Sequence, residues 1–298
     1  MTDPGPLRRS YAVRMLHIAG VADAAVERAL ATVPREDFLG PPPWTILDHT
    51  VGAIEVTDAD PRPLYEDVLV VLDQARGLNN GSPSLHALML HHLDVHCGDR
   101  VLHVGAGTGY YTAMLAELAG PQGSVIAIEY DPRLAGAARA NLRPWSNVTV
   151  VEGDGADWPD GPVDRIYVNF AVADPAASWI DNLATGGTLV LPLGTPPIRA
   201  RGEARRYSGH GSVLACTHTA SGIVVRHLTH CAFVCAEGSL AGTPALQEAL
   251  DRAFLRGGIE FVRSYRRPPP PSPERCWFWS PAWALSYDAL SCGAQGAP

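Results

Sequence analysis

Three glycines follow a short apolar run near the middle of the chain, and an acid ends the next such run. Gly105, Gly107 and Gly109 come directly after Val101 to Val104 and precede a helical stretch. Because glycine adopts positive φ without steric cost, this loop can turn tightly and let a ligand approach the backbone where the helix begins. Glu129 ends the second run, where its carboxylate can accept hydrogen bonds from both hydroxyls of a ribose. The pattern predicts a nucleoside cofactor at this turn.

The glycine spacing narrows the choice of cofactor. A dinucleotide fingerprint needs G-x-G-x-x-G, whereas Tyr110 occupies the sixth place here and the loop reads G-x-G-x-G. The diphosphate interpretation therefore loses its third glycine and is disfavoured, although it stays open. A plain strand-turn-helix unit, whose glycines serve packing alone, is the other alternative.

The block from Arg100 to Leu142 resembles the cofactor half of class I S-adenosylmethionine-dependent methyltransferases. Neighbouring stretches are similar to the protein-L-isoaspartate O-methyltransferase family: Val33 to Phe38, Gly153 to Gly155, and the run from Asp164 to Gly194. Together these stretches extend the resemblance over residues 9 to 235. The resemblance implies S-adenosyl-L-methionine (SAM) as the methyl donor.

The resemblance also implies which residues hold the donor. Glu129 should hold the ribose, Asp154 and Gly155 should border the adenine, and Gly105 to Gly109 should face the methionine part. The full set of expected cofactor contacts is His103, Gly105, Ala106, Gly107, Thr108, Gly109, Tyr110, Glu129, Tyr130, Asp154 and Gly155.

Two positions depart from the family pattern. His103 stands where the family usually has an acid that helps to hold the donor's ammonium group. The substrate-side motif, usually Thr-Ile-Ser-x-Pro-His, reads Asn79-Asn80-Gly81-Ser82-Pro83-Ser84 here, with Gly81 at the serine place and Ser84 at the histidine place. These departures leave open whether donor binding or acceptor choice is altered.

Ser82 and Ser84 are the predicted catalytic residues. Ser82 is a helix cap and Pro83 suits the first helical position, so a helix is expected from Pro83 to Val95 with free amides and hydroxyls at its start. A carboxylate is ionised at neutral pH and the sulfonium of SAM is electrophilic, so methyl ester formation needs positioning more than a strong base. The two hydroxyls could hold the second oxygen of an acceptor carboxylate, although capping alone would also explain them.

The alternation of strands and helices predicts an α/β, Rossmann-like methyltransferase fold. Strands are expected at 101–104, 125–129, 148–152, 165–169 and 188–193, and a hairpin around Ala220 to Gly222 brings a mostly parallel sheet to seven strands with an antiparallel edge. Asp131-Pro132 and Asp174-Pro175 are expected helix starts, and Gly186-Gly187 an expected helix stop. Helices are expected at 9–19, 22–32 and 244–256.

Three regions follow from this interpretation. Residues 1–78 form an N-terminal helical and substrate-side region, 79–236 the SAM-binding core, and 237–298 a C-terminal extension. The extension carries Trp277, Trp279 and Trp283 after a proline run, and it either caps a partner or substrate or folds back onto the domain.

Composition limits the partners. The net charge of −8 disfavours a nucleic-acid substrate, and the basic segment Arg199 to Arg206 is the local exception. No apolar stretch is long enough for a membrane span and the first residues lack a signal core, so a cytoplasmic location without a membrane partner is expected. The six cysteines are scattered, which is typical of reduced thiols. In a strand His230 would face away from His227, Cys231 and Cys235, so no metal site is predicted.

Three functions remain in order of preference. The first is a carboxyl O-methyltransferase that acts on an aspartyl or isoaspartyl group of a peptide or protein. The second is a tailoring methyltransferase for a small carboxylate or other secondary metabolite, favoured by the altered motif and the extension. The third is a non-catalytic cofactor-binding scaffold, favoured by His103 and Gly81. The sequence leaves the acceptor, the oligomeric state and the role of the extension undecided.

Overall fold

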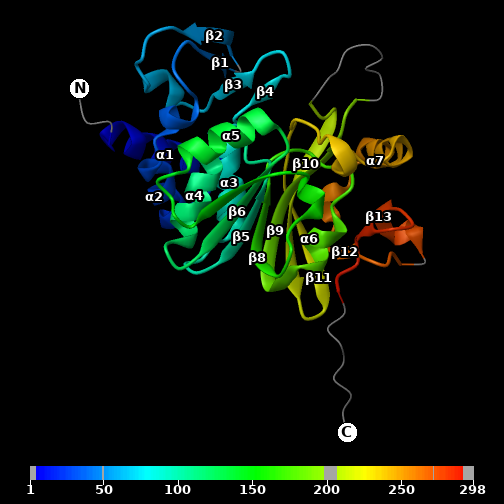
Figure 1. The fold of residues 1–298 in the computed structure, drawn as a ribbon. Coiled ribbons are helices and arrows are strands. Elements are labelled where there is room, and N and C mark those ends of the chain that lie inside the picture. The colour runs from blue at the N-terminus through cyan, green and yellow to red at the C-terminus, as the bar shows by residue number, and fades with distance from the viewer. Residues whose placement is uncertain (1–4, 49, 198–206, 271, 291–298) are drawn as a thin grey trace. The chain divides into compact units, whose positions relative to one another are not determined.

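The computed structural model describes residues 5–48, 50–197, 207–270 and 272–290 (Figure 1). The chain separates into two compact units, Met1–Gly155 and Ala156–Pro298. The basic segment Arg199 to Arg206 and Cys292 lie outside the described residues.

The first unit begins with two helices, α1 (Gly5–Ala19) and α2 (Ala24–Thr32). Asp23 caps α2, because its carboxylate accepts hydrogen bonds from the amides of Ala25 and Val26 at 2.9 and 3.0 Å. Such a cap stabilises a helix by about 1 kcal/mol. The two predicted N-terminal helices are confirmed.

A small antiparallel sheet follows, in the order β2-β1-β3-β4. Its strands are β1 (Trp44–Asp48), β2 (Gly52–Val56), β3 (Leu69–Asp73) and β4 (Leu78–Asn79). A buried apolar cluster holds it together: Trp44, Ile46, Val56, Leu64, Val68 and Val70. This part of the chain has no single apolar period in its sequence, and it builds its core from three strands, β1, β2 and β3, and the loop between β2 and β3.

The cofactor half of the first unit contains three parallel strands in the order β5-β6-β7. They are β5 (Arg100–Val104), β6 (Ser124–Glu129) and β7 (Val148–Glu152), with Val104 opposite Ile128 and Glu129 opposite Glu152. Helix α3 (Pro83–Leu93) precedes them, and α4 (Tyr110–Ala119) and α5 (Pro132–Asn141) connect them. Because the strands are parallel and in register, their carboxyl ends share one edge of the sheet.

The second unit opens with two further parallel strands and the predicted hairpin. Strand β8 (Val163–Val168) pairs in parallel with β9 (Leu183–Thr195), and the short helix α6 (Ala177–Asp181) lies between them in sequence. Strand β9 then pairs antiparallel with β10 (His210–Thr219), and β10 with β11 (Gly222–His230). The hairpin turn at Ala220 and Ser221 is therefore where the sequence predicted it.

The C-terminal extension continues this sheet. Helix α7 (Pro244–Arg256) is followed by β12 (Ser264–Arg266), β13 (Cys276–Trp279) and β14 (Ala284–Ser286), which pair antiparallel in the order β11-β12-β14-β13. Trp277 and Trp283 are buried, whereas Trp279 is exposed, so two of the three tryptophans of the extension pack on its own unit. The seven predicted strands are all present among the described residues, and β12, β13 and β14 add three that the sequence did not predict.

Two predictions about helix ends are wrong. Asp174-Pro175 does not start a helix: α6 begins at Ala177, and the Asp174 carboxylate accepts a hydrogen bond from the indole of Trp283 at 2.8 Å. Gly186 and Gly187 lie inside β9 and do not end a helix. A Cβ on Gly187 would lie 2.7 Å from the carbonyl oxygen of Asp164, so close packing of β9 on β8 requires glycine there.

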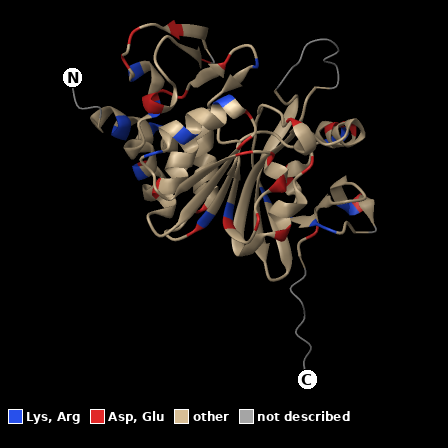
Figure 2. Ribbon diagram, in the orientation of Figure 1, with Lys and Arg blue, Asp and Glu red and all other residues tan. Residues whose placement is uncertain are grey.

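Charged residues of both signs are interspersed on each unit (Figure 2). Among the helices that the structure describes, none combines the length and apolarity needed to cross a bilayer.

Candidate functional site

The glycine loop joins β5 to α4 through backbone conformations that favour glycine. Gly105, Gly107 and Gly109 have φ values of 84°, 58° and 100°. The amides of Gly105 and Ala106 donate to the carbonyl of Ile128 at 2.9 and 3.1 Å, which fixes the loop to the end of β6. A Cβ on Gly109 would overlap Leu142, 2.8 Å from its Cδ1 atom. The predicted tight turn is confirmed, and its backbone lies at the carboxyl edge of the strands.

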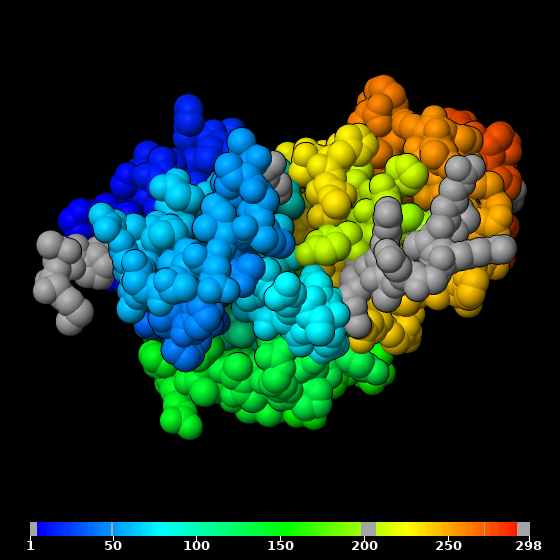
Figure 3. All heavy atoms as spheres, turned by 90° about the horizontal axis from the view of Figure 1, so that it is seen from above, coloured from blue at the N-terminus to red at the C-terminus, as the bar shows by residue number. Residues whose placement is uncertain are grey.

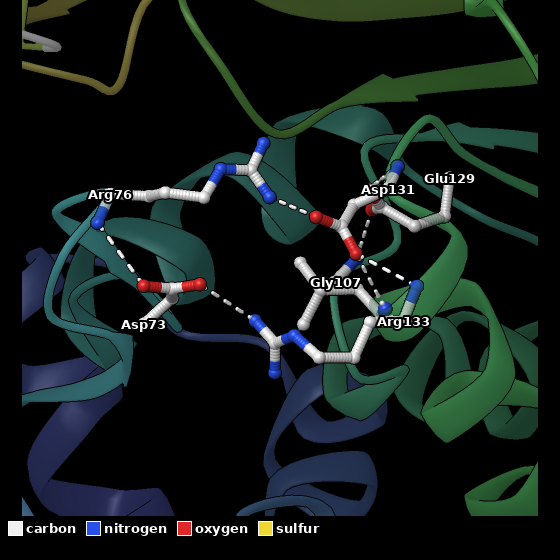
Figure 4. Close-up of polar contacts among 7 residues, drawn as sticks. Asp73, Arg76, Gly107, Glu129, Asp131 and Arg133 are labelled. Atoms are coloured by element: carbon white, nitrogen blue, oxygen red, sulfur yellow. Dashed lines mark hydrogen bonds and ion pairs between the residues drawn. The ribbon is translucent and has the colours of Figure 1, made fainter.

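The Glu129 carboxylate is held directly against this loop (Figure 4). One oxygen accepts a hydrogen bond from the Gly107 amide at 2.7 Å, and the other accepts one from the Asp131 amide at 2.9 Å. Glu129 is 7% exposed, and burial raises the pKa of its carboxyl against the opposing effect of those two amides. Each oxygen keeps a further lone pair, so the side chain can still accept two hydroxyl donors.

The segment after β7 supplies the other predicted nucleoside contacts. Gly155 is buried, and a Cβ there would overlap the Val104 side chain at the end of β5. Asp154 is half-buried beside it, and Tyr130, directly after Glu129, is 56% exposed. The structure therefore brings the loop, Glu129, Tyr130 and the Asp154–Gly155 pair to one edge of the β5-β6-β7 sheet.

Two predicted cofactor residues point their side chains into the core. His103 is fully buried, its Nδ1 atom lies 2.8 Å from the Thr112 hydroxyl, and burial lowers its pKa to about 3. Tyr110 is 2% exposed, and its hydroxyl lies 3.4 Å from that of Tyr11. The imidazole in place of the family's acid is therefore neutral at physiological pH. Ala106 is buried and Thr108 half-buried within the loop itself.

The two predicted catalytic serines share one internal carboxylate. The Ser82 hydroxyl donates to Asp67 Oδ1 at 2.9 Å, and the Ser84 hydroxyl donates to Asp67 Oδ2 at 2.6 Å. The Ser84 amide also donates to Asp67 Oδ1 at 3.0 Å. Ser82 caps α3 as predicted. The helix ends at Leu93, two residues before the predicted end. Sequence reasoning missed Asp67, which lies in a stretch without a regular pattern.

A buried arginine fixes the segment that carries Asp67. Arg35 is fully buried, and its guanidinium donates to the carbonyl of Leu64, to those of Glu66 and Val68 at 3.2 and 2.7 Å, and to the Asn80 side chain at 3.2 Å. Buried cations are stable in proteins only when hydrogen-bonded in this way. Arg35 belongs to the Val33 to Phe38 stretch that carried the family resemblance, but its spacing gave no sign of this role.

Gly81 and His86 fit together across the start of α3. The His86 ring is fully buried and stacks on Tyr111, with the ring centroids 3.6 Å apart. A Cβ on Gly81 would overlap that ring, 2.7 Å from Cδ2 and closer still to Nε2, and Gly81 has a φ of 78°. Burial lowers the pKa of His86 well below its usual value. At the position where the family usually has serine, this chain therefore has a glycine, and the neutral His86 ring occupies the space that a side chain at position 81 would need.

Comparison with protein families gives a match over more than two thirds of the chain. The family model "Protein-L-isoaspartate(D-aspartate) O-methyltransferase (PCMT)" matches residues 8–221. Among curated relatives, a protein-L-isoaspartate O-methyltransferase of Aeropyrum pernix is 36% identical over 203 residues, which cover 66% of this chain and 71% of the relative. Protein-L-isoaspartate O-methyltransferase 2 of Archaeoglobus fulgidus is 42% identical over 122 residues, which cover 40% of this chain and 56% of the relative.

Solved structures agree on the fold. A protein-L-isoaspartate O-methyltransferase matches with a TM-score of 0.64 and 24% identity, over 87% of this chain and 72% of its own. A second structure of that description, from Plasmodium falciparum in complex with S-adenosyl-L-homocysteine (SAH), matches with a TM-score of 0.58 and 19% identity, over 77% of this chain and 98% of its own.

These matches confirm the predicted methyltransferase fold, the enzyme class and SAM as the methyl donor. They also confirm carboxyl O-methylation of isoaspartyl residues as the reaction of the group. The chain belongs to the protein-L-isoaspartate(D-aspartate) O-methyltransferase family.

Proposed function

We propose that this chain transfers the methyl group of SAM to the side-chain carboxylate of an isoaspartyl residue in a peptide or protein, with the donor lying against the edge that the glycine loop and Glu129 form together. The observation that carries the proposal is the buried Glu129 carboxylate, whose two oxygens are fixed by the amides of Gly107 and Asp131. A carboxylate held in this way is oriented for two neighbouring hydroxyls before any ligand arrives.

The other residues at this edge fit an adenosine sulfonium. The three glycines of the loop expose backbone without side chains, and Gly155 lets the segment after β7 pack closely on Val104. The exposed Tyr130 ring can cover an adenine face, since offset stacking of aromatic groups is favourable. When bound, SAM supplies an electrophilic methyl on its sulfonium.

The acceptor needs to be held in line rather than activated. An isoaspartyl carboxylate is already ionised at neutral pH, so the protein has no proton to remove from it. Its tasks are to orient one acceptor oxygen toward the methyl group and to exclude water. His86 and His103 are fully buried and burial lowers the pKa of both, so neither imidazole carries a charge at neutral pH.

Ser82 and Ser84 remain candidate acceptor contacts, and their bonds to Asp67 define the test of that role. While both hydroxyls donate to Asp67, their protons are not directed at a second carboxylate. If they bind the acceptor, Ser82→Ala and Ser84→Ala should raise KM for a peptide and leave SAH affinity unchanged. If they only organise the start of α3 with Asp67, the same variants should lower stability without a specific rise in KM.

The activity is tested by incubating the purified protein with methyl-labelled SAM and three matched peptides that contain isoaspartyl, aspartyl or asparaginyl residues at one position. The proposal expects label in the isoaspartyl peptide as a base-labile ester, and far less from a Glu129→Ala variant at a SAM concentration near the wild-type KM. Label that is absent, or stable to base, contradicts carboxyl methylation.

The acceptor class and the cellular location are also tested by experiment. A set of small carboxylic acids and phenols, included in the same assay, tests the alternative of a small-molecule acceptor. Transfer to one of these compounds but not to peptides would favour that alternative. A cytoplasmic location rests on the sequence alone, and cell fractionation is its direct test.

A further inference from the structure

Two aspartates and two arginines link the β3–β4 hairpin to the start of α5 in a reciprocal pattern (Figure 4). Asp73 accepts the Arg76 amide at 3.1 Å with one oxygen and the Arg133 guanidinium at 3.0 Å with the other. Asp131 accepts the amides of Arg133 and Leu134 at 2.8 and 2.9 Å with one oxygen and the Arg76 guanidinium with the other. Each carboxylate therefore caps its own turn and binds the arginine of the other element. We call these four residues the Asp–Arg network.

The network is directly connected to the donor site. Asp131 is two residues after Glu129, and its amide is one of the two donors that fix the Glu129 carboxylate. On the hairpin side, Leu72 precedes Asp73, and its Cδ1 atom would lie 3.9 Å from a Cβ on Gly107. The hairpin thus lies over the glycine loop, and Figure 3 shows the cyan atoms of this part of the chain beside green atoms of the cofactor half. The hairpin therefore contacts both residues whose amides hold the Glu129 carboxylate: Gly107 through Leu72, and Asp131 through Arg76.

We propose that Arg76 and Asp73 are positioning residues for the methyl donor. They hold the hairpin over the loop and keep the Asp131 turn, and through it Glu129, in the geometry that binds the ribose. This inference rests on the donor site proposed above. It adds that the β3–β4 hairpin, which lies outside β5, the glycine loop and α4, affects how tightly the donor is bound.

The two ion pairs differ in burial, which ranks their expected effects. In the Arg76–Asp131 pair the side chains are 31% and 13% exposed, whereas in the Arg133–Asp73 pair they are 59% and 22% exposed. Water screens exposed pairs strongly, and many contribute little. Loss of the Arg76 side chain should therefore weaken donor binding more than loss of the Arg133 side chain.

The experiment measures SAH binding, so it does not depend on knowing the acceptor. Arg76→Gln, Arg133→Asp, Asp73→Arg and the double reversal Arg133→Asp/Asp73→Arg are compared with the wild-type chain by isothermal titration calorimetry, with SAH release followed by displacement. Arg139→Gln is the matched control, because Arg139 lies on the same helix and pairs with Glu152 at 3.6 Å, away from the network. Thermal unfolding of each ligand-free variant is recorded alongside.

The expected result is about fivefold weaker SAH binding and faster release for Arg76→Gln, with smaller losses for the single reversals. The double reversal should recover part of the loss, because it restores the Arg–Asp pair but not the acceptor for the Arg76 amide, and Arg139→Gln should bind as the wild type does. Single variants that bind like the wild type overturn the inference, as does a double reversal that binds SAH no better than the two single reversals. A wild-type chain that binds no SAH would instead contradict the donor site itself.

Discussion

The close packing of Gly81 against His86 predicts that Gly81→Ala lowers the free energy of unfolding, and the size of the loss can be worked out from the structure. In Gly81→Ala the new Cβ overlaps the buried His86 ring, and the residue must also keep a φ of 78°. A left-handed conformation costs an L-residue about 1–2 kcal/mol. Overpacking a core costs about 1–3 kcal/mol. The variant should therefore lose about 2–5 kcal/mol of unfolding free energy.

Matched glycine variants separate the two costs. Gly20 also has a positive φ, of 69°, but nothing lies near its Cβ position, so Gly20→Ala reports the conformational cost alone. Gly136 lies inside α5 with open space around it, and Gly136→Ala should be neutral or slightly stabilising. A double-mutant cycle combines Gly81→Ala with His86→Ala, which removes the ring that the new Cβ overlaps. The double variant should lose less unfolding free energy than the sum of the two single variants, by a coupling energy of about 1–3 kcal/mol.

The assay is urea denaturation of each variant, followed by near-ultraviolet circular dichroism for the packing of the His86–Tyr111 stack and by far-ultraviolet signals for the helices. Additive losses in the double variant would show that the Cβ and the imidazole do not compete for the same space. A neutral Gly81→Ala would refute both the overlap and the backbone argument.

Three further predictions concern titration and binding at this site. Burial holds the pKa of His103 at about 3, against an ordinary value of 6.5, so the unfolded chain binds more protons than the folded chain below pH 6.5. The free energy of unfolding should therefore fall as the pH is lowered, by about 1 kcal/mol per pH unit for this group. His103→Gln should reduce that slope, as urea titrations at several pH values can measure. Burial raises the pKa of the Glu129 carboxyl, so on acidification it takes up a proton at a higher pH than an ordinary glutamate does. SAH affinity, measured by calorimetry across pH, should begin to fall at that higher pH. An affinity that stays constant down to pH 4.5 would contradict this. Tyr130→Ala should weaken SAH binding by about 1 kcal/mol if the exposed ring covers the adenine, while an unchanged Kd would remove that contact.

The sequence predicted the local structure around the proposed donor site well because its parts are close together in the chain. The glycine loop, the strand that ends in Glu129 and the Asp131 cap lie within about thirty residues, and each depends on backbone rules that act over a few positions. Parallel pairing then brings Gly155 to the same edge of the sheet. In this part of the chain the predicted strand ends differ from the observed ones by at most one residue.

The sequence could not predict the contacts that link distant segments. Asp67 reaches the serines of α3, Arg35 binds carbonyls about thirty residues away, and Arg76 pairs with Asp131, but none of these partners is fixed by spacing. The wrong helix start at Asp174 has the same origin, because its side chain is engaged by Trp283 from the extension. Local capping rules fail where a tertiary partner competes for the cap.

The short strands of the extension were missed for another reason. Strands β12 and β14 contain three residues each and β13 four, with prolines between β12 and β13, and such lengths leave no periodic signal. Only β12 pairs with β11, and β14 and β13 follow it in the sheet. Trp277 and Trp283 are buried there, and the sequence marks them as apolar without indicating what they cover.

The central claim is that Glu129 holds the ribose of the methyl donor at the glycine loop. The most direct test is calorimetric titration of SAH into the wild-type chain and into Glu129→Ala, with a nicotinamide dinucleotide as the comparison ligand. Hydrogen bonds to a charged group contribute about 1.5–3 kcal/mol each, so loss of two should weaken SAH binding by about 100-fold or more. Tight SAH binding to the wild type, with little heat from the dinucleotide, is the predicted result. Equal SAH affinity in the variant, or preference for the dinucleotide, would contradict the claim.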